Sequence, residues 1–156
     1  MASRTALPGT ESTGDVWTTT YIDRLPGGAI GYSKVTANQG SITTAVDLTS
    51  LTVTVTVNAS RLILISAYGL FTNGTNGDGA AMTILEGATQ LASSSGIGPS
   101  NAVGFALTPS ALLVAPSTGS HTYKCQGVQQ IGGTVTLNAS STAPAYILVQ
   151  DLGPSF

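Results

Sequence analysis

The sequence predicts an all-β fold, an antiparallel β-sandwich of about eight to ten strands that follows an extended N-terminal arm. The clearest observation is Thr52–Val57, which alternates threonine and valine. This period of two places valines on one face of a strand and threonines on the other. Similar β-rich runs recur as far as residue 152, separated by turn residues, and no window between them has helical spacing over ten or more residues. The pattern therefore favours a sandwich or barrel over alternating strands and helices.

The expected strands are short runs rich in β-branched, aliphatic and aromatic residues. In chain order they are Ala29–Ala37, Ile42–Leu48, Thr52–Val57, Arg61–Phe71, Ala80–Glu86, Thr89–Ser94, Val103–Val114, His121–Val128, Thr134–Ala139 and Ala145–Leu152. The main turn clusters between them are Asn73–Gly79, Ser95–Asn101, Ala115–Ser120 and Ile131–Gly133. We expect these strands to form two sheets, each with one face in a shared core.

Charge is scarce along the chain. Lys and Arg number 5 and Asp and Glu number 7, which is 8% of 156 residues, against about 25% in ordinary globular domains. So few cations argue against nucleic-acid binding, which depends on neutralising phosphates. The densest apolar run, Leu62–Ile65, is far shorter than the roughly 20 residues of a bilayer span, so we expect no membrane insertion. With only two lysines to guard strand edges, we expect sister subunits to cover part of the sheets.

Residues 1–28 form an arm of different composition. They carry five of the twelve charges and end in Pro26-Gly27-Gly28, a strong turn signal. Trp17, Tyr21 and Leu25 recur every four residues, which suits one face of a helix, whereas the intervening β-branched threonines favour an extended segment. In either conformation the arm has too little apolar surface to fold alone. We expect Trp17, Tyr21 and Leu25 to contact a partner surface or a sister arm, or else to fold back onto the sandwich.

His121 and Cys125 are the candidate base and nucleophile, since each is the single residue of its type. Four residues apart on a strand, their Cα atoms would lie about 13 Å apart, beyond the reach of a nucleophile and its base. We therefore interpret His121 as a strand residue and Cys125 as a small buried apolar residue. A single cysteine also excludes an intrachain disulfide.

Metal and cofactor sites are not predicted. One Cys and one His do not supply the four ligands of zinc within one chain. The turn Asn73–Gly79 superficially resembles a calcium loop but offers one carboxylate, Asp78, where an EF-hand supplies several. We interpret this turn as a flexible hairpin loop, and its Asn73, Asn76 and Asp78 as a candidate exposed binding loop.

Enzymatic activity is not predicted either. The sequence contains no nucleophile elbow and no phosphate-binding loop. The acids that follow the arm lie in loops or near strand ends with nothing to pair them; they are Asp47, Asp78, Glu86 and Asp151. The residues alone therefore indicate a structural or binding module.

Several segments of residues 25–154 resemble a family of small virion proteins of tailed actinobacteriophages that are often called minor tail proteins. The matching segments are Leu25–Tyr32, Val35–Gln39, Ile42–Leu48, Leu51–Val57, Glu86–Leu91, Gly119–Lys124 and Ala145–Pro154. The resemblance implies a jelly-roll-like β domain without enzymatic activity or cofactor, a homotrimer on the particle exterior, made in the host cytoplasm.

The composition shift and the Pro26-Gly27-Gly28 break divide the chain, and the resemblance implies its partners. Residues 1–28 would be an anchoring arm, 29–153 the sandwich and 154–156 a tail. The arm would bind a major capsid or tail protein. The chain has no long stalk and no second domain, so we favour capsid decoration over a minor tail component. The alternative is a host-surface glycan-binding module of the tail that uses the loops Asn73–Gly79 and Ser95–Asn101.

Overall fold

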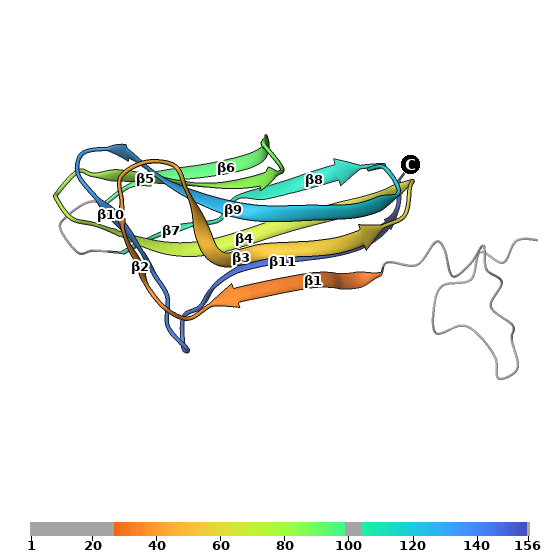
Figure 1. The fold of residues 1–156 in the computed structure, drawn as a ribbon, viewed down its shortest axis with the longest axis horizontal. Helices are drawn as coiled ribbons and strands as arrows, with labels where there is room; N and C mark the ends of the chain where they lie inside the picture. The colour runs from red at the N-terminus through yellow and green to blue at the C-terminus, as the bar shows by residue number, and fades with distance from the viewer. Residues whose placement is uncertain (1–26, 99–103, 156) are drawn as a thin grey trace, which may run out of the picture.

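The computed structural model describes residues 27–98 and 104–155, and in this part of the chain the regular structure is eleven β-strands (Figure 1). The strands are β1 (Gly28–Val35), β2 (Gln39–Ile42), β3 (Val46–Val57), β4 (Arg61–Asn73), β5 (Gly79–Glu86), β6 (Thr89–Ile97), β7 (Phe105–Leu107), β8 (Ser110–Val114), β9 (Gly119–Ile131), β10 (Val135–Asn138) and β11 (Ala145–Pro154). None of the described residues forms a helix long and apolar enough to cross a bilayer.

The strands form two antiparallel sheets. One has seven strands. Five follow the order β1-β11-β4-β10-β2, and the short strands β7 and β8 also pair with β4. The second has four strands in the order β3-β9-β5-β6. The two sheets lie face to face as long layers (Figure 1), and the predicted all-β sandwich is confirmed.

The core lies between the sheets and follows the strand period. On β4 the odd-numbered side chains from Ile63 to Phe71 point inward and are buried. The valines of the Thr-Val repeat on β3 point into the same core from the other sheet, while the threonines are exposed. Tyr123 and Cys125 on β9 complete the centre. The alternation seen in the sequence therefore decides which side of each of these strands faces the core.

Three predicted strand boundaries were wrong. The predicted run Val103–Val114 contains two strands, because Pro109 lacks the N–H that a continuous ladder needs. The run Ile42–Leu48 also divides, since β2 ends at Ile42 and β3 starts at Val46. Residues Ser95–Ile97, predicted as turn, extend β6. The division at Pro109 raises the strand number to eleven in the described part, whereas Val46–Leu48 joins the expected strand Thr52–Val57 within β3.

The two ends of the sandwich differ. β1 starts where β11 finishes, with Gly28 opposite Asp151, so the chain enters and leaves the sandwich at one end (Figure 1). The β4–β5 turn lies at the opposite end. A strand of 13 residues, such as β4, spans about 43 Å between these ends. We call them the arm end and the loop end.

Candidate functional site

Part of the outer face of the seven-stranded sheet, over β1, β11, β4 and β8, is largely apolar, although it does not face the core. On β4 the outward side chains alternate with the buried ones and include Leu62, Leu64 and Tyr68. Strands with one solvated face normally carry polar residues there. A strand that is apolar on both sides indicates that something covers its second face.

Strand pairing extends this surface sideways. Leu62 lies opposite Val114 and Leu64 opposite Leu112, both on β8. On the other side of β4, Tyr68 lies opposite Tyr146 of β11. We define the apolar face by the apolar outward side chains of these four neighbouring strands, which lie around the outward polar residues Ser66, Ser110 and Gln150: Tyr32, Leu62, Leu64, Tyr68, Leu112, Val114, Tyr146 and Leu148.

A row of tyrosines crosses the apolar face from β1 to β4. The ring centroids of Tyr68 and Tyr146 are 5.7 Å apart and stacked, and those of Tyr32 and Tyr146 are 6.2 Å apart. Such rings supply a large contact area with little rotamer freedom to lose. Each also carries a hydroxyl that can meet water or a partner.

The apolar face is exposed at its margins and almost free of charge. Val114 is 63% exposed, Leu112 and Tyr32 are each 54% exposed, and these residues lie on the outer strands β8 and β1. On the four strands of the face, the one charged side chain that points outward is that of Lys34, on the edge strand β1. The face therefore presents hydrophobic area to any partner, with one cation at the rim.

The outer face of the four-stranded sheet is polar by contrast. Thr54 and Thr122 share a hydrogen bond of 2.8 Å between their hydroxyls. Lys124 donates to Asp47 at 2.8 Å, and this hydrogen bond is the main cause that lowers the pKa of Asp47. The two outer faces thus differ in chemistry, and only one of them is suited to burial.

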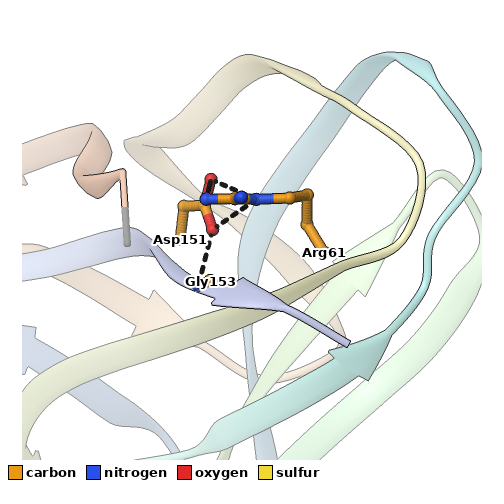
Figure 2. A network of polar contacts seen from close by, with 3 residues as sticks. All are labelled: Arg61, Asp151 and Gly153. Carbon is orange, nitrogen blue, oxygen red and sulfur yellow. Dashed lines mark hydrogen bonds and ion pairs between the residues drawn. The ribbon is translucent and has the colours of Figure 1, made fainter. Parts of the chain in front are cut away.

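An ion pair closes the arm end of the sandwich (Figure 2). Arg61 Nε lies 3.0 Å from both carboxylate oxygens of Asp151, and Nη2 lies 2.8 Å from Oδ2. The backbone N–H of Gly153 donates to the same carboxylate at 2.9 Å. A Cβ at Gly27 would approach Asp151 Oδ2 to 2.8 Å, so the chain passes directly over this pair as it enters β1.

The residues of the predicted binding loop are mostly not exposed. Asn76 faces solvent, but Asn73 and Asp78 are only 4% and 3% exposed. Asn73 Nδ2 donates to the carbonyl of Thr75 at 2.7 Å, and Asp78 accepts from the Thr75 N–H at 3.0 Å. The expected exposure is corrected for these two residues, because their side chains hold the turn together from within. Ligand binding by this loop stays a prediction.

The other candidate residues have different outcomes. Trp17, Tyr21 and Leu25 lie outside the described residues. Cys125 is fully buried, and burial raises its pKa to about 12, so the thiol is no nucleophile near neutral pH. The acids predicted to lack partners do have them: Asp47 bonds to Lys124, Asp151 to Arg61, and Glu86 to His121. Within residues 27–98 and 104–155, no group of three or more His, Cys, Asp or Glu side chains is arranged to hold a metal ion.

Sequence reasoning missed the apolar face, although a signal was present. Leu62–Ile65 is apolar at four successive positions, which is typical of a strand covered on both faces. The run was interpreted as part of the expected strand Arg61–Phe71 and as too short for a membrane span, and its second apolar face was not assigned a role. The tyrosine row left no such signal, because Tyr32, Tyr68 and Tyr146 come together only through strand pairing.

Comparison with known proteins supports the fold. No family model matches the chain, and no curated protein matches it. Among solved structures, murine APRIL at pH 5.0 is similar with a TM-score of 0.53 and 8% identity, over 80% of this chain and 99% of that chain. Eiger TNF from S. frugiperda gives a TM-score of 0.49 and 11% identity, over 83% and 96% of the two chains. The tripod (BppUct-A-L) from the baseplate of bacteriophage Tuc2009 gives 0.40 and 15%, over 97% and 78%. At these identities the likeness concerns the jelly-roll-like fold alone.

Proposed function

We propose that this protein is a non-enzymatic structural component of a phage virion that associates as a homotrimer through the apolar face. The observation that carries the proposal is a hydrophobic sheet face, charged only at the Lys34 rim, whose marginal residues Leu112 and Val114 are more than half exposed. Exposed apolar surface of this kind marks an interaction site.

The apolar face has the area of a functional surface patch, and it would supply the apolar part of a subunit interface. Four strands about 4.8 Å apart and four rows of side chains about 6.7 Å apart cover roughly 20 Å by 25 Å, or about 500 Å². Functional patches on monomers measure about 300–600 Å², and a standard interface buries about 800 Å² on each partner. Identical uncharged faces can pack against one another without charge repulsion, so copies of the same chain fit this surface.

The number of subunits and the virion location rest on the sequence resemblance described above. The two distinct ends of the sandwich are compatible with an oriented position on a virion surface. The arm enters at the Arg61–Asp151 end, and the β4–β5 turn lies at the other. In our proposal the arm end faces the lattice, where residues 1–28 bind a major capsid or tail protein. The loop end then projects outward, as in capsid decoration.

Native mass spectrometry and sedimentation of the full chain test the association. A trimer has three times the 15.6 kDa of one chain. A stable monomer at micromolar concentration would overturn the proposed trimer.

A second pair of experiments tests the arm. Deletion of residues 1–26 is expected to leave the melting temperature of the free protein nearly unchanged and to abolish its incorporation into particles. Trp17→Ala is expected to weaken particle binding at an unchanged melting temperature. A lowered melting temperature in Trp17→Ala would instead show that Trp17 packs on its own sandwich.

A host-glycan-binding module is the second candidate, and the tyrosine row favours it. Tyr32, Tyr68 and Tyr146 present apolar ring faces with hydroxyls at their tips, which suit the faces and hydroxyls of sugar rings. The two candidates compete for one surface. Glycan binding that shifts the tyrosine NMR signals of a monomeric chain would favour this module over the structural trimer.

A further inference from the structure

A histidine lies buried at the arm end of the four-stranded sheet. His121 is the single histidine of the chain and is 9% exposed. It points inward from β9, the same side as Tyr123, and Glu86 at the end of β5 lies opposite Tyr123 in the strand register. The mechanism of association proposed above makes no use of these residues.

Both ring nitrogens of His121 contact hydrogen-bond acceptors. Nδ1 lies 2.5 Å from Glu86 Oε1, and Nε2 lies 2.9 Å from the carbonyl oxygen of Ser117. Neither a carboxylate nor a carbonyl can donate, so both contacts are satisfied only when both nitrogens carry a proton. A neutral imidazole has one N–H. Loss of one proton therefore breaks one of the two contacts, whichever tautomer forms.

Among the described residues, no cationic side chain is bonded to His121. Glu86 is the charged group that β5 presents, and Tyr123 on β9 stacks on the imidazole with centroids 6.1 Å apart. On the β3 side, Val55 is the cross-strand partner. In the described part of the chain, Arg61 and Asp151 are the other charged groups at this end, and they form an ion pair with each other.

Ser117 belongs to the connection between β8 and β9, residues 115–118. This connection is also tied at its two ends, where Ala115 N–H donates to the carbonyl of Arg61 at 2.9 Å and Ala59 N–H donates to Thr118 Oγ1 at 2.8 Å. Its middle is held by His121. The connection follows directly after β8, whose Leu112 and Val114 form one margin of the apolar face.

We propose that His121 is a pH-sensitive latch that, when doubly protonated, fastens the β8–β9 connection to β5 and holds the β8 margin of the apolar face in its associating position. Association then weakens as the pH rises. The link to association rests on the proposed function, whereas the latch itself does not.

The direction of the pH response follows from the contacts. The hydrogen bond to Glu86, and after it the one to Ser117, raise the pKa of His121 above its ordinary 6.5. A group with a raised pKa stabilises the folded state fully below its unfolded value, and this stabilisation is lost as pH rises through the folded value. Burial raises the pKa of Tyr123 and of Cys125 to about 12. Neither of them therefore contributes to a change between pH 6 and 9.

NMR of the single histidine tests the latch in the full chain. At pH 6 we expect both ring nitrogens to be protonated, and we expect a pKa above 6.5. Amide hydrogen exchange at Ala115, whose N–H donates to the carbonyl of Arg61, should, once corrected for its intrinsic pH dependence, accelerate roughly tenfold or more from pH 6 to 9, as loss of a hydrogen bond to a charged group implies. A pKa at or below 6.5, or corrected exchange that does not change, would overturn the latch.

Two variants separate the latch from a general pH effect. His121→Gln keeps a polar side chain that does not titrate, and its corrected exchange should be equal at pH 6 and 9. Glu86→Gln keeps the histidine and removes the carboxylate, so the pKa of its histidine should fall toward 6.5. This measurement tests the proposal even if His121→Gln fails to fold. An unchanged pKa in Glu86→Gln would contradict the proposal.

The trimer dissociation constant at pH 6 and 9 tests the coupling. It should increase with pH in the wild type and stay constant in His121→Gln. A wild-type constant that is independent of pH, in a chain whose histidine titrates as expected, would overturn the coupling alone. A chain that is monomeric at both pH values would refute the proposed trimer, and the NMR and exchange results would still decide the latch.

Discussion

Leu112→Asp is the sharpest perturbation of the apolar face. Leu112 is 54% exposed and lies on the outer strand β8. Its outward side chain pairs with Leu64 rather than with the core. The substitution therefore changes the face and leaves the sandwich interior intact.

The magnitude follows from the exposed area. Complete burial of a leucine stabilises by about 1.5–3 kcal/mol, so the half that is still exposed is worth roughly 1 kcal/mol per subunit at an interface. Removing it from three subunits, as in Leu112→Ala, amounts to about 3 kcal/mol, or about 100-fold in the trimer association constant. The aspartate adds an unpaired charge in each buried face, which raises the penalty by several kcal/mol. We expect Leu112→Ala to form a weaker trimer and Leu112→Asp to be monomeric.

Sedimentation velocity at micromolar concentration reports the mass, and circular dichroism reports the fold. The melting temperature of a monomeric Leu112→Asp chain should match that of wild type diluted below its dissociation constant. Thr56→Asp is the matched control, because Thr56 is an exposed outward residue of β3 on the other sheet. Its association should equal that of wild type. If Leu112→Asp assembles with wild-type affinity, the apolar face is not the interface.

Two further predictions concern stability, measured by urea unfolding. Gly132→Ala places a Cβ 1.6 Å from Asp78 Oδ1 at a φ of +89°, whereas Gly77→Ala has a φ of +85° and no atom within 4 Å. We expect Gly77→Ala to lower the free energy of unfolding by about 1–2 kcal/mol through backbone strain alone, and Gly132→Ala to lower it by at least about 3 kcal/mol. Equal losses in the two variants would show that the Asp78 carboxylate is not held where we describe it. Asp151→Ala removes the carboxylate that Arg61 contacts in a largely buried site and should cost about 3 kcal/mol. A loss below about 1 kcal/mol, the value typical of exposed pairs, would show that this pair is solvated.

Local pattern was sufficient for the fold class. The Thr-Val alternation of Thr52–Val57 and the turn residues of the β4–β5 connection specify strand and turn within a few residues of themselves. This is why the all-β sandwich could be predicted. Strand ends were less certain, since Pro109 interrupts an apolar run that otherwise reads as one strand.

Pairing over long sequence distances was beyond local pattern. His121 and Glu86 are 35 residues apart, and Arg61 and Asp151 are 90 residues apart. Which acid meets which cation depends on strand register, and register is decided by the packing of whole sheets. For that reason the sequence alone showed acids without partners, while the structure pairs three of them.

The sequence by itself determined that this chain forms β-strands with few charges, because alternation and composition are properties of short segments. The tertiary structure decided that the leucines of β4 and β8 and the tyrosines of β1, β4 and β11 share one outward face. It also decided that Asn73 and Asp78 point inward. The physical reason is that a side chain's burial depends on what the neighbouring strands place around it, and those neighbours come from distant parts of the chain.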